Sequence, residues 1–467
     1  MNKIIIIITL LGAVLRLVNI SPYHFYPDVY QNLLVAQNIK AFDSVVGPLG
    51  LFGYIFPPFI LWTRPIFPFF ILALAPFVPD YMTAGHMVAF FAGVLAIPLS
   101  YLAIVAIWKN NIAGLGASLL TAASFQHVVW SGNVMTETLG VLLMLVVLYR
   151  LAKKQFNMFT GIFLGLLVFT RYEYALLLIP ICIWFIVNKS WQPMIYALFT
   201  IVFMLWLLFP PITQLLPPAS TQVSVTSIPE FLAPTGLYTF MKYDPLVSVL
   251  FLFGIVMMIV HKKYIHVAAV LFSMALLYFT YYRSNPHQSR YLVHLLPFLL
   301  IGASYGVMHV KKMPIKLGIV ALALYQLFLS FYGIKPWNNG DYTRVSYEEQ
   351  SAKTLNQKLT NKETLLITSF PEPYYYFTKI PTNSVSNNFP YIFLTSSDDQ
   401  PVTIVLDMGM QDLFPNFASV VEKNFTVAFT YTTDAPYYYA GTRHDSTKPV
   451  QVYETTAGEL RNSIEKN

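Results

Sequence analysis

The chain has 467 residues, of which 56% are hydrophobic and only 11% are charged. Soluble globular proteins carry about 25% charged residues, so this composition excludes a soluble enzyme, a disordered chain and a nucleic-acid-binding protein. The net charge of +7 is divided unevenly, with +11 in residues 1–334 and −4 in residues 335–467. The single cysteine, Cys182, excludes an intrachain disulfide and a cysteine-cluster metal site. The composition predicts a polytopic membrane protein with a polar tail.

Apolar runs near the length that crosses a bilayer, about 17–25 residues, recur through the first 334 residues. We predict about eleven transmembrane spans, approximately at residues 4–20, 84–107, 111–128, 135–151, 158–170, 172–187, 193–213, 245–260, 265–282, 291–308 and 314–333. The first run continues through Arg16 and no small-residue cleavage site follows it, so we interpret it as a span and not as a signal peptide. The predicted fold is mainly α-helical, a polytopic transmembrane helix bundle.

Charge sets the expected orientation. With the amino terminus inside, the predicted cytoplasmic connections are basic and contain no acid, as the positive-inside rule requires. Their basic residues are Lys3, Lys109, Arg150, Lys153, Lys154, Lys189, Lys262, Lys263, Lys311, Lys312 and Lys316. The seven acids of the membrane half then lie on the outer side: Asp28, Asp43, Asp80, Glu137, Glu173, Glu230 and Asp244. We expect a plasma-membrane protein with a cytoplasmic amino terminus and, from the odd number of spans, an extracytoplasmic tail.

The long first outer loop, residues 21–83, is too apolar for a flexible linker. Val29, Leu33, Ala36 and Ile39 recur at helical spacing, which predicts a helix lying along the membrane interface. The apolar stretch from Pro65 to Pro79 is interrupted by prolines and predicts a second interfacial or re-entrant piece.

The composition changes abruptly after residue 334, and we divide the chain into a transmembrane domain, 1–334, and a soluble extracytoplasmic domain, 335–467. Ser346–Leu359 has the pattern of an amphipathic helix. Three segments have the apolar, β-branched composition of short strands: Leu365–Thr368, Val402–Leu406 and Phe425–Thr430. The tail is therefore predicted to be a small α/β domain.

Asp28 follows the first span by a few residues, in Tyr26-Pro27-Asp28-Val29-Tyr30. A carboxylate in this place suits a general base acting on an incoming hydroxyl, or a ligand of a divalent cation. The alternative is structural, because Asp before a helix with Gln31 three residues later also forms a capping box. The local sequence leaves both interpretations open.

Two further acids lie where spans begin or meet at the outer side. Glu137 opens a span, where the positive end of the helix dipole alone would stabilise it. Arg171 and Glu173 lie at the tip of a tight hairpin, where they are either interfacial anchors or part of a site.

A cationic loop completes the candidate residues. Residues 283–291 contain Arg283, His287, Arg290 and Tyr291, and Arg64 adds a cation in the first loop. Guanidinium groups bind phosphate through paired donors, and they also bind lipid headgroups. The acids on the same side favour a phosphate-binding site.

Several short motifs together resemble the GT-C superfamily of polytopic glycosyltransferases, most closely the branch of the protein O-mannosyltransferases and the lipid A aminoarabinose transferase. In chain order they are Asp28 after the first span, Arg64-Pro65-Ile66-Phe67-Pro68, Glu137, Gly161–Leu166 with Thr170–Glu173, and Arg290-Tyr291 with Pro297. The resemblance is best over residues 10–187 and weaker over 283–300.

The resemblance implies a sugar donor linked through phosphate to a polyprenol, a glycan, lipid or protein acceptor, and inverting transfer on the outer face of the cell envelope. It implies that Asp28 and Glu137 are the catalytic acids, with Arg64, Arg171, Glu173, His287, Arg290 and Tyr291 binding substrate or phosphate. Val29 stands where the family often has a second acid, so a metal site of adjacent acids is not implied. A divalent cation is left open, with Asp28 and Glu137 as its ligands.

The physical chemistry agrees with this expectation. Glycosyl transfer passes through an oxocarbenium-like state, and a phosphate leaving group requires cations and no general acid. The alternatives are a transporter or flippase of a lipid-linked glycan, and a non-catalytic scaffold. A transporter usually keeps its ionisable groups near the bilayer midplane, in repeated halves, whereas these acids gather at one side.

Overall fold

The computed structural model describes residues 3–20, 27–41, 66–187, 191–208, 241–284, 289–310, 313–332, 347–369, 371–380, 382–384, 397–433, 437–439, 442–444 and 449–465. Contacts divide the described elements into two units. The first contains α1 and the helices from α5 to α18, and the second contains α2 and all elements from α20 onward.

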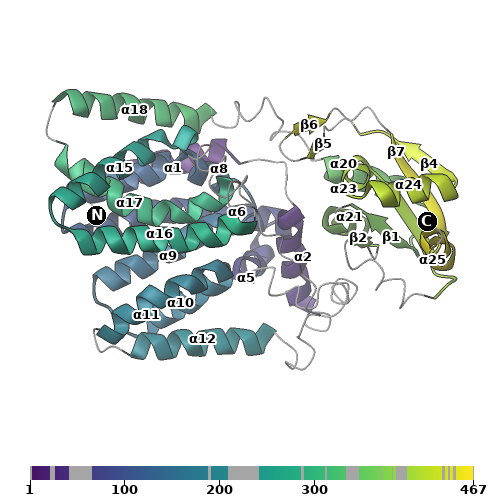
Figure 1. Ribbon diagram of the computed structural model, residues 1–467, viewed down its shortest axis with the longest axis horizontal. Coiled ribbons are helices and arrows are strands. Elements are labelled where there is room, and N and C mark those ends of the chain that lie inside the picture. Colours follow the sequence, from purple (N-terminus) through teal and green to yellow (C-terminus); the bar gives the residue numbers. More distant parts are fainter. Residues whose placement is uncertain are drawn as a thin grey trace. The chain divides into compact units, whose positions relative to one another are not determined.

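The first unit is a bundle of helices that lie side by side (Figure 1). In chain order they are α1 (Lys3–Val18), α5 (Ile66–Leu74), η1 (Ala75–Phe77), α6 (Tyr81–Trp108), α7 (Asn111–Ala123), α8 (Phe125–Ser131), α9 (Glu137–Ala152), α10 (Met158–Thr170), η2 (Tyr172–Leu177), α11 (Leu178–Val187), α12 (Gln192–Leu208), α15 (Pro245–Val260), α16 (Tyr264–Ser284), η4 (Ser289–Leu295), α17 (Leu296–His309) and α18 (Met313–Tyr332). Glycines bring α15 and α17 together, since a Cβ on Gly254 would lie 1.8 Å from the carbonyl oxygen of Gly302.

Within the described residues, two helices are long and apolar enough to cross a membrane, Tyr81–Trp108 and Leu292–His309. A third candidate is the bent pair α7 and α8, and seven shorter apolar helices of 10–17 residues accompany them. The helical class of the bundle is confirmed, and the number of about eleven spans stays a prediction.

The predicted span at residues 111–128 is bent in the structure, because the helix breaks at Ser124 and its two parts differ in direction by 56°. The backbone N–H groups of Phe125 and Gln126 donate to the two carboxylate oxygens of Asp244, at 2.8 and 3.0 Å. That of His127 donates to the Ser124 hydroxyl at 3.4 Å. In an unbroken helix these three N–H groups would donate to the backbone carbonyl oxygens of residues 121–123.

The carbonyl groups released by the break also have partners. The buried guanidinium group of Arg16 on α1 donates to the carbonyl oxygens of Thr121 and Ala122, at 3.0 and 3.4 Å. The hydroxyl of Ser330 on α18 donates to the carbonyl oxygen of Ala123 at 2.6 Å. A cation therefore stands at the carboxyl end of α7 and an anion at the amino end of α8, as the helix dipoles favour. Apart from the local cap by Ser124, the partners described at the break come from residues distant in the sequence.

The second unit contains a five-stranded sheet in the order β2-β1-β3-β7-β4. Its strands are β1 (Leu365–Thr368), β2 (Thr382–Ser384), β3 (Pro401–Leu406), β4 (Val427–Tyr431) and β7 (Val450–Thr456). β1 is parallel to β2 and β3, while β7 is antiparallel to β3 and β4. The two short strands β5 (Tyr437–Tyr439) and β6 (Thr442–His444) form a separate antiparallel pair. The predicted α/β class of the tail is confirmed.

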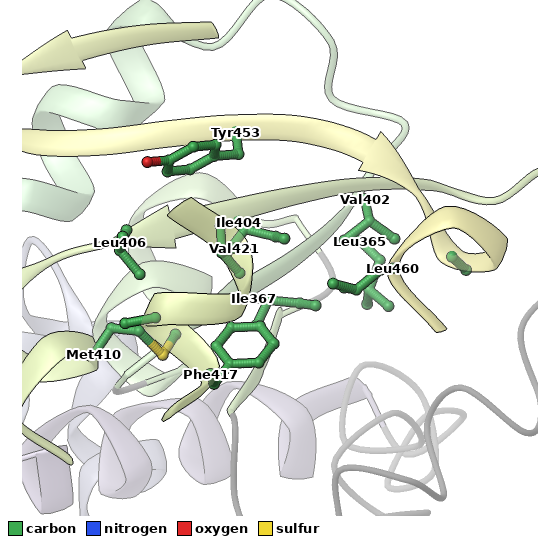
Figure 2. Close-up of a cluster of buried hydrophobic side chains, with 12 residues drawn as sticks. Leu365, Ile367, Val402, Ile404, Leu406, Met410, Phe417, Val421, Tyr453 and Leu460 are labelled. Atoms are coloured by element: carbon green, nitrogen blue, oxygen red, sulfur yellow. The ribbon is translucent and has the colours of Figure 1, made fainter. Parts of the chain in front are cut away.

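Helices cover both faces of this sheet. α23 (Met408–Leu413), α24 (Pro415–Asn424) and α25 (Ala457–Glu465) pack on one face. Figure 2 shows Ile367 beside Phe417, Ile404 beside Val421 and Leu365 beside Leu460. α20 (Tyr347–Lys358) and α21 (Pro371–Thr378) pack on the other face, with Leu366. Neighbouring residues of β1 thus enter opposite cores, as the period of a strand requires. The predicted strand at 365–368 is confirmed.

The first-loop helix is also confirmed, as α2 (Pro27–Ala41), and it packs against α21 of the tail. That α2 lies along the membrane interface stays a prediction. α2 begins at Pro27, so the backbone places Asp28 in the first turn of the helix; the Asp28 side chain lies outside the described part of the chain.

A buried carboxylate follows β3 in the tail. Asp407 is 1% exposed, and its oxygens accept hydrogen bonds from the Met410 backbone N–H at 2.7 Å, the Ser369 hydroxyl at 2.9 Å and the Tyr374 hydroxyl at 2.9 Å. Burial raises the pKa of Asp407, and these hydrogen bonds oppose part of the rise.

A raised pKa means that the folded domain binds the proton of Asp407 more tightly than the unfolded chain does. The protonated Asp407 carboxyl group contributes its full stabilisation below its unfolded pKa, near 3.9. This stabilisation is lost as the pH rises through the folded pKa. Asp407→Asn removes this titration. We expect the Tm advantage of the wild type over the variant to be largest near pH 4 and to shrink toward pH 7. Thermal unfolding of the purified full chain measures it, with Asp399→Asn as the exposed control. A Tm difference that is constant across this range would contradict the raised pKa.

Candidate functional site

Five polar side chains meet inside the helical unit. We call them the Arg171 cluster: Glu137, Arg171, Glu173, Tyr174 and His294. They come from the amino end of α9, the junction between α10 and η2, and the end of η4. Arg171 ends α10 with an extended backbone, which releases it from the helix and turns the chain into η2.

Arg171 is the central group of the cluster. Its Nη1 atom lies 3.0 Å from Oε1 of Glu137 and 3.0 Å from Nε2 of His294, and all three residues are fully buried. Its Nη2 atom lies 3.6 Å from Oε1 of Glu173, which is 21% exposed. Charged groups buried among apolar helices are costly and are kept mainly where they serve a function.

The contacts of His294 select one tautomer. Because a guanidinium group only donates hydrogen bonds, Nε2 of His294 accepts from Arg171, and the ring proton lies on Nδ1. Nδ1 then donates to the Tyr174 hydroxyl at 2.7 Å. Arg171, His294 and Tyr174 form a chain of hydrogen bonds that fixes the orientation of the ring.

Gly140, about one turn after Glu137, packs so closely against these groups that no larger residue fits there. A Cβ on Gly140 would lie 2.9 Å from the Tyr174 hydroxyl and 3.2 Å from Nδ1 of His294. A larger residue at this position would push the tyrosine and histidine out of their hydrogen bonds, so the absence of a side chain at residue 140 lets η2 and η4 approach α9.

Two buried oxygens at the start of α9 have no hydrogen-bond partner among the described residues, Oε2 of Glu137 and Oγ1 of Thr136. A buried polar atom without a partner costs free energy, about 1–3 kcal/mol. These atoms are therefore the places in the cluster where a substrate hydroxyl or a water gains most from binding.

The structure brings together three of the predicted site residues, Glu137, Arg171 and Glu173. Arg290 and Tyr291 lie in η4, four and three residues before His294, but their side chains lie outside the described part of the chain, as does that of Asp28. Arg64 and His287 are not among the described residues.

Sequence reasoning missed His294, Gly140 and the role of Tyr174 as a partner of His294. A signal existed for His294, because an ionisable residue inside a predicted span is a functional candidate by default. It also missed the buried pair of Arg16 and His127, whose Nη2 and Nδ1 atoms lie 2.7 Å apart.

The cluster as described does not fit a divalent cation. Oε1 of Glu137 is bonded to a guanidinium group, and Nε2 of His294 accepts from the same cation. Among the described residues, no group of three or more His, Cys, Asp or Glu side chains could hold a metal ion.

No protein-family model matches the sequence, and no curated protein matches it. Solved structures are similar in fold. ArnT from Cupriavidus metallidurans bound to undecaprenyl phosphate aligns with a TM-score of 0.61 at 12% identity, over 97% of this chain and 98% of that chain. Its apo form gives a TM-score of 0.58 at the same identity and coverage.

The oligosaccharyltransferase of Archaeoglobus fulgidus in complex with Zn and sulfate aligns with a TM-score of 0.51 at 13% identity, over 95% of this chain and 73% of that chain. The fold is that of the GT-C glycosyltransferases. The resemblance found in the sequence is thereby confirmed for the fold. At this identity the similarity assigns no role to an individual residue.

Proposed function

We propose that the protein is a membrane glycosyltransferase that moves a sugar from a polyprenyl-phosphate donor to a glycan, lipid or protein acceptor on the outer face of the membrane, with inversion. The observation that carries this proposal is the buried ion pair of Glu137 and Arg171, held by His294, in a chain with this fold. The undecaprenyl phosphate bound to the similar ArnT supports a polyprenyl-linked donor.

The proposed reaction is a displacement at the anomeric carbon. The acceptor hydroxyl attacks that carbon, its proton passes to a carboxylate, and the bond from the carbon to the phosphate oxygen breaks. The polyprenyl phosphate leaves with the bonding electron pair. Attack opposite the leaving group inverts the anomeric centre. Because phosphate is already a good leaving group, cations that stabilise its charge are sufficient.

Each candidate residue has a proposed role in this reaction. Asp28 is the general base, and Glu137 orients Arg171 through Oε1 while Oε2 accepts from a substrate hydroxyl. Arg171, together with the cationic side chains of the two loops, stabilises the charge on the phosphate. The further phosphate- and substrate-binding residues are Arg64, Glu173, His287, Arg290 and Tyr291.

The orientation in the membrane stays part of the proposal. The basic residues of the connections favour a cytoplasmic amino terminus and an extracytoplasmic tail in the plasma membrane. About eleven spans and the division at residue 334 are consistent with this orientation. Transfer then takes place on the outer face, in the cell envelope.

The alternative function is a transporter or flippase of a lipid-linked glycan. It is favoured by the break between α7 and α8, because transporters build substrate sites from broken helices. However, the groups released by that break are bonded to Asp244, Ser124, Arg16 and Ser330, which leaves a glycosyltransferase as the better-supported function.

The test is a transfer assay with the full chain reconstituted in liposomes. Polyprenyl phosphates carrying a panel of radiolabelled pentoses and hexoses are offered with membrane glycan, lipid and protein fractions as acceptors. We expect label to move to one acceptor class from at least one donor, and the polyprenyl phosphate to be released in equal amount. Movement of the donor across the bilayer without transfer of label would instead show a flippase.

A further inference from the structure

A buried tyrosine joins the helix that carries Asp28 to the carboxyl-terminal domain. Tyr30 is 1% exposed, and its hydroxyl donates to Oε2 of Glu349 on α20 at 2.6 Å. Its ring contacts the rings of Tyr376 and Phe377 on α21, with centroids 5.3 and 5.7 Å apart. Both interactions join residues separated by more than 300 positions in the chain.

The acceptor in this contact is itself held in place. Oε1 of Glu349 lies 2.6 Å from Nζ of Lys353 one turn later on α20, and the Lys353 ammonium lies 4.9 Å from the centre of the Phe377 ring. The Glu349 side chain is 7% exposed, and its carboxylate pairs with the Lys353 ammonium and accepts a hydrogen bond from the Tyr30 hydroxyl. A hydrogen bond to a buried carboxylate is among the stronger ones in proteins.

The same face of α2 makes a second contact two turns later, where Nζ of Lys379 lies 3.5 Å from Oε1 of Gln37. Residues 30 and 37 lie on one face of a helix, since seven residues are about two turns. At about 100° per residue, position 28 lies about 160° around the helix from position 30. The tail therefore holds the face of α2 that is opposite to the position of Asp28.

We propose that the carboxyl-terminal domain positions the proposed catalytic base, and that Tyr30 and Glu349 are the positioning residues through which it does so. This inference rests on the proposed function, because it assigns the tail a role in the reaction of Asp28. The tail domain contacts α2 through α20 and α21, and its other helices, α23 to α25, cover the far face of the sheet. The domain is thus required for the rate of transfer and not for membrane insertion.

The first measurement needs no substrate. Tyr30→Phe removes one hydroxyl and keeps the ring contacts, so we expect the domain to remain folded while amide hydrogen exchange in residues 29–41 becomes faster. Tyr453→Phe is the matched control. Tyr453 also donates a side-chain hydrogen bond, to Gln451 at 2.9 Å, but it belongs to the core on the face of the sheet that α23 to α25 cover. Exchange in α2 should not change in the control.

The second measurement uses the polyprenyl-phosphate sugar of the panel that gives transfer. We expect Tyr30→Phe and Glu349→Leu each to lower kcat roughly 10- to 100-fold, with the KM for the donor little changed. Glu349→Gln, which keeps an acceptor oxygen, should recover most of the rate. The double variant should be no slower than the slower single one, because both remove the same interaction.

Epistasis with Asp28 separates positioning from a general loss of structure. If Tyr30 acts through Asp28, Tyr30→Phe should not lower the residual rate of the Asp28→Asn protein any further, whereas a structural loss would lower both rates by the same factor. A wild-type protein that transfers no sugar from the panel overturns the proposed function. A wild type that transfers sugar, with Tyr30→Phe at the wild-type rate or with unchanged exchange in α2, overturns the positioning role alone.

Discussion

Asp28→Asn is expected to lower the rate of sugar transfer by roughly 10²–10⁴-fold, the usual effect of removing a general base. An amide does not accept the proton of the attacking hydroxyl, although it has the same shape as the carboxylate. Insertion and folding should remain normal, since the substitution is isosteric and lies in the first turn of α2. The measurement is the transfer assay on reconstituted protein at equal amounts of inserted chain.

The capping alternative makes the opposite prediction for the same variant. Asparagine caps a helix about as well as aspartate, so a purely structural Asp28 would be replaced without loss. Asp43→Asn in the same loop is the control and should be mild. An Asp28→Asn protein that transfers sugar near the wild-type rate would remove Asp28 from the mechanism, and Glu137 would become the leading base.

Arg171→Met should both destabilise the protein and abolish most of its activity. It leaves Glu137 as an uncompensated buried charge, which costs about 3–5 kcal/mol, and it removes a cation from the proposed site, which costs roughly 10²–10³ in rate. Arg150→Met is the control, because Arg150 bonds Thr160 and Asn157 outside the Arg171 cluster. Thermal unfolding in detergent and the transfer assay measure the two effects separately.

The double variant Glu137→Gln with Arg171→Met decides between a structural and a functional ion pair. Removing both charges relieves the buried anion, so thermal stability should recover to near the wild-type value. Activity should stay as low as in the single variant, since the cation is still absent. Recovery of both properties in the double variant would show that the pair serves the fold alone.

Local patterns predicted much of the second unit. The strand at 365–368 was predicted from its apolar, β-branched composition, and the helix from about 347 from its amphipathic pattern; both features are visible within one segment. β7, at residues 450–456, was not predicted, because Gln451, Glu454 and four threonines or valines form no clear apolar face before β3 and β4 pair with the strand.

The candidate site could be predicted only in part. Glu137, Arg171 and Glu173 were identified as ionisable groups at the ends of apolar runs, and the structure brings them together. His294 lies 123 positions from Arg171, so nothing in its own segment indicated which group it would bond. The tautomer of its ring follows from contacts on both nitrogens, and these exist only in the folded bundle.

The sequence by itself determined the membrane class, the uneven distribution of charge and the positions of most helices, because each depends on the composition of one continuous segment. The tertiary structure alone decided where the span at 111–128 breaks and that the helix of Asp28 belongs to the tail's unit. The break needs Asp244 and Arg16, and the attachment of α2 needs a hydrogen bond between residues 319 positions apart. The physical reason is that a buried polar group must find a partner, and the chain can supply that partner from any distance along its sequence.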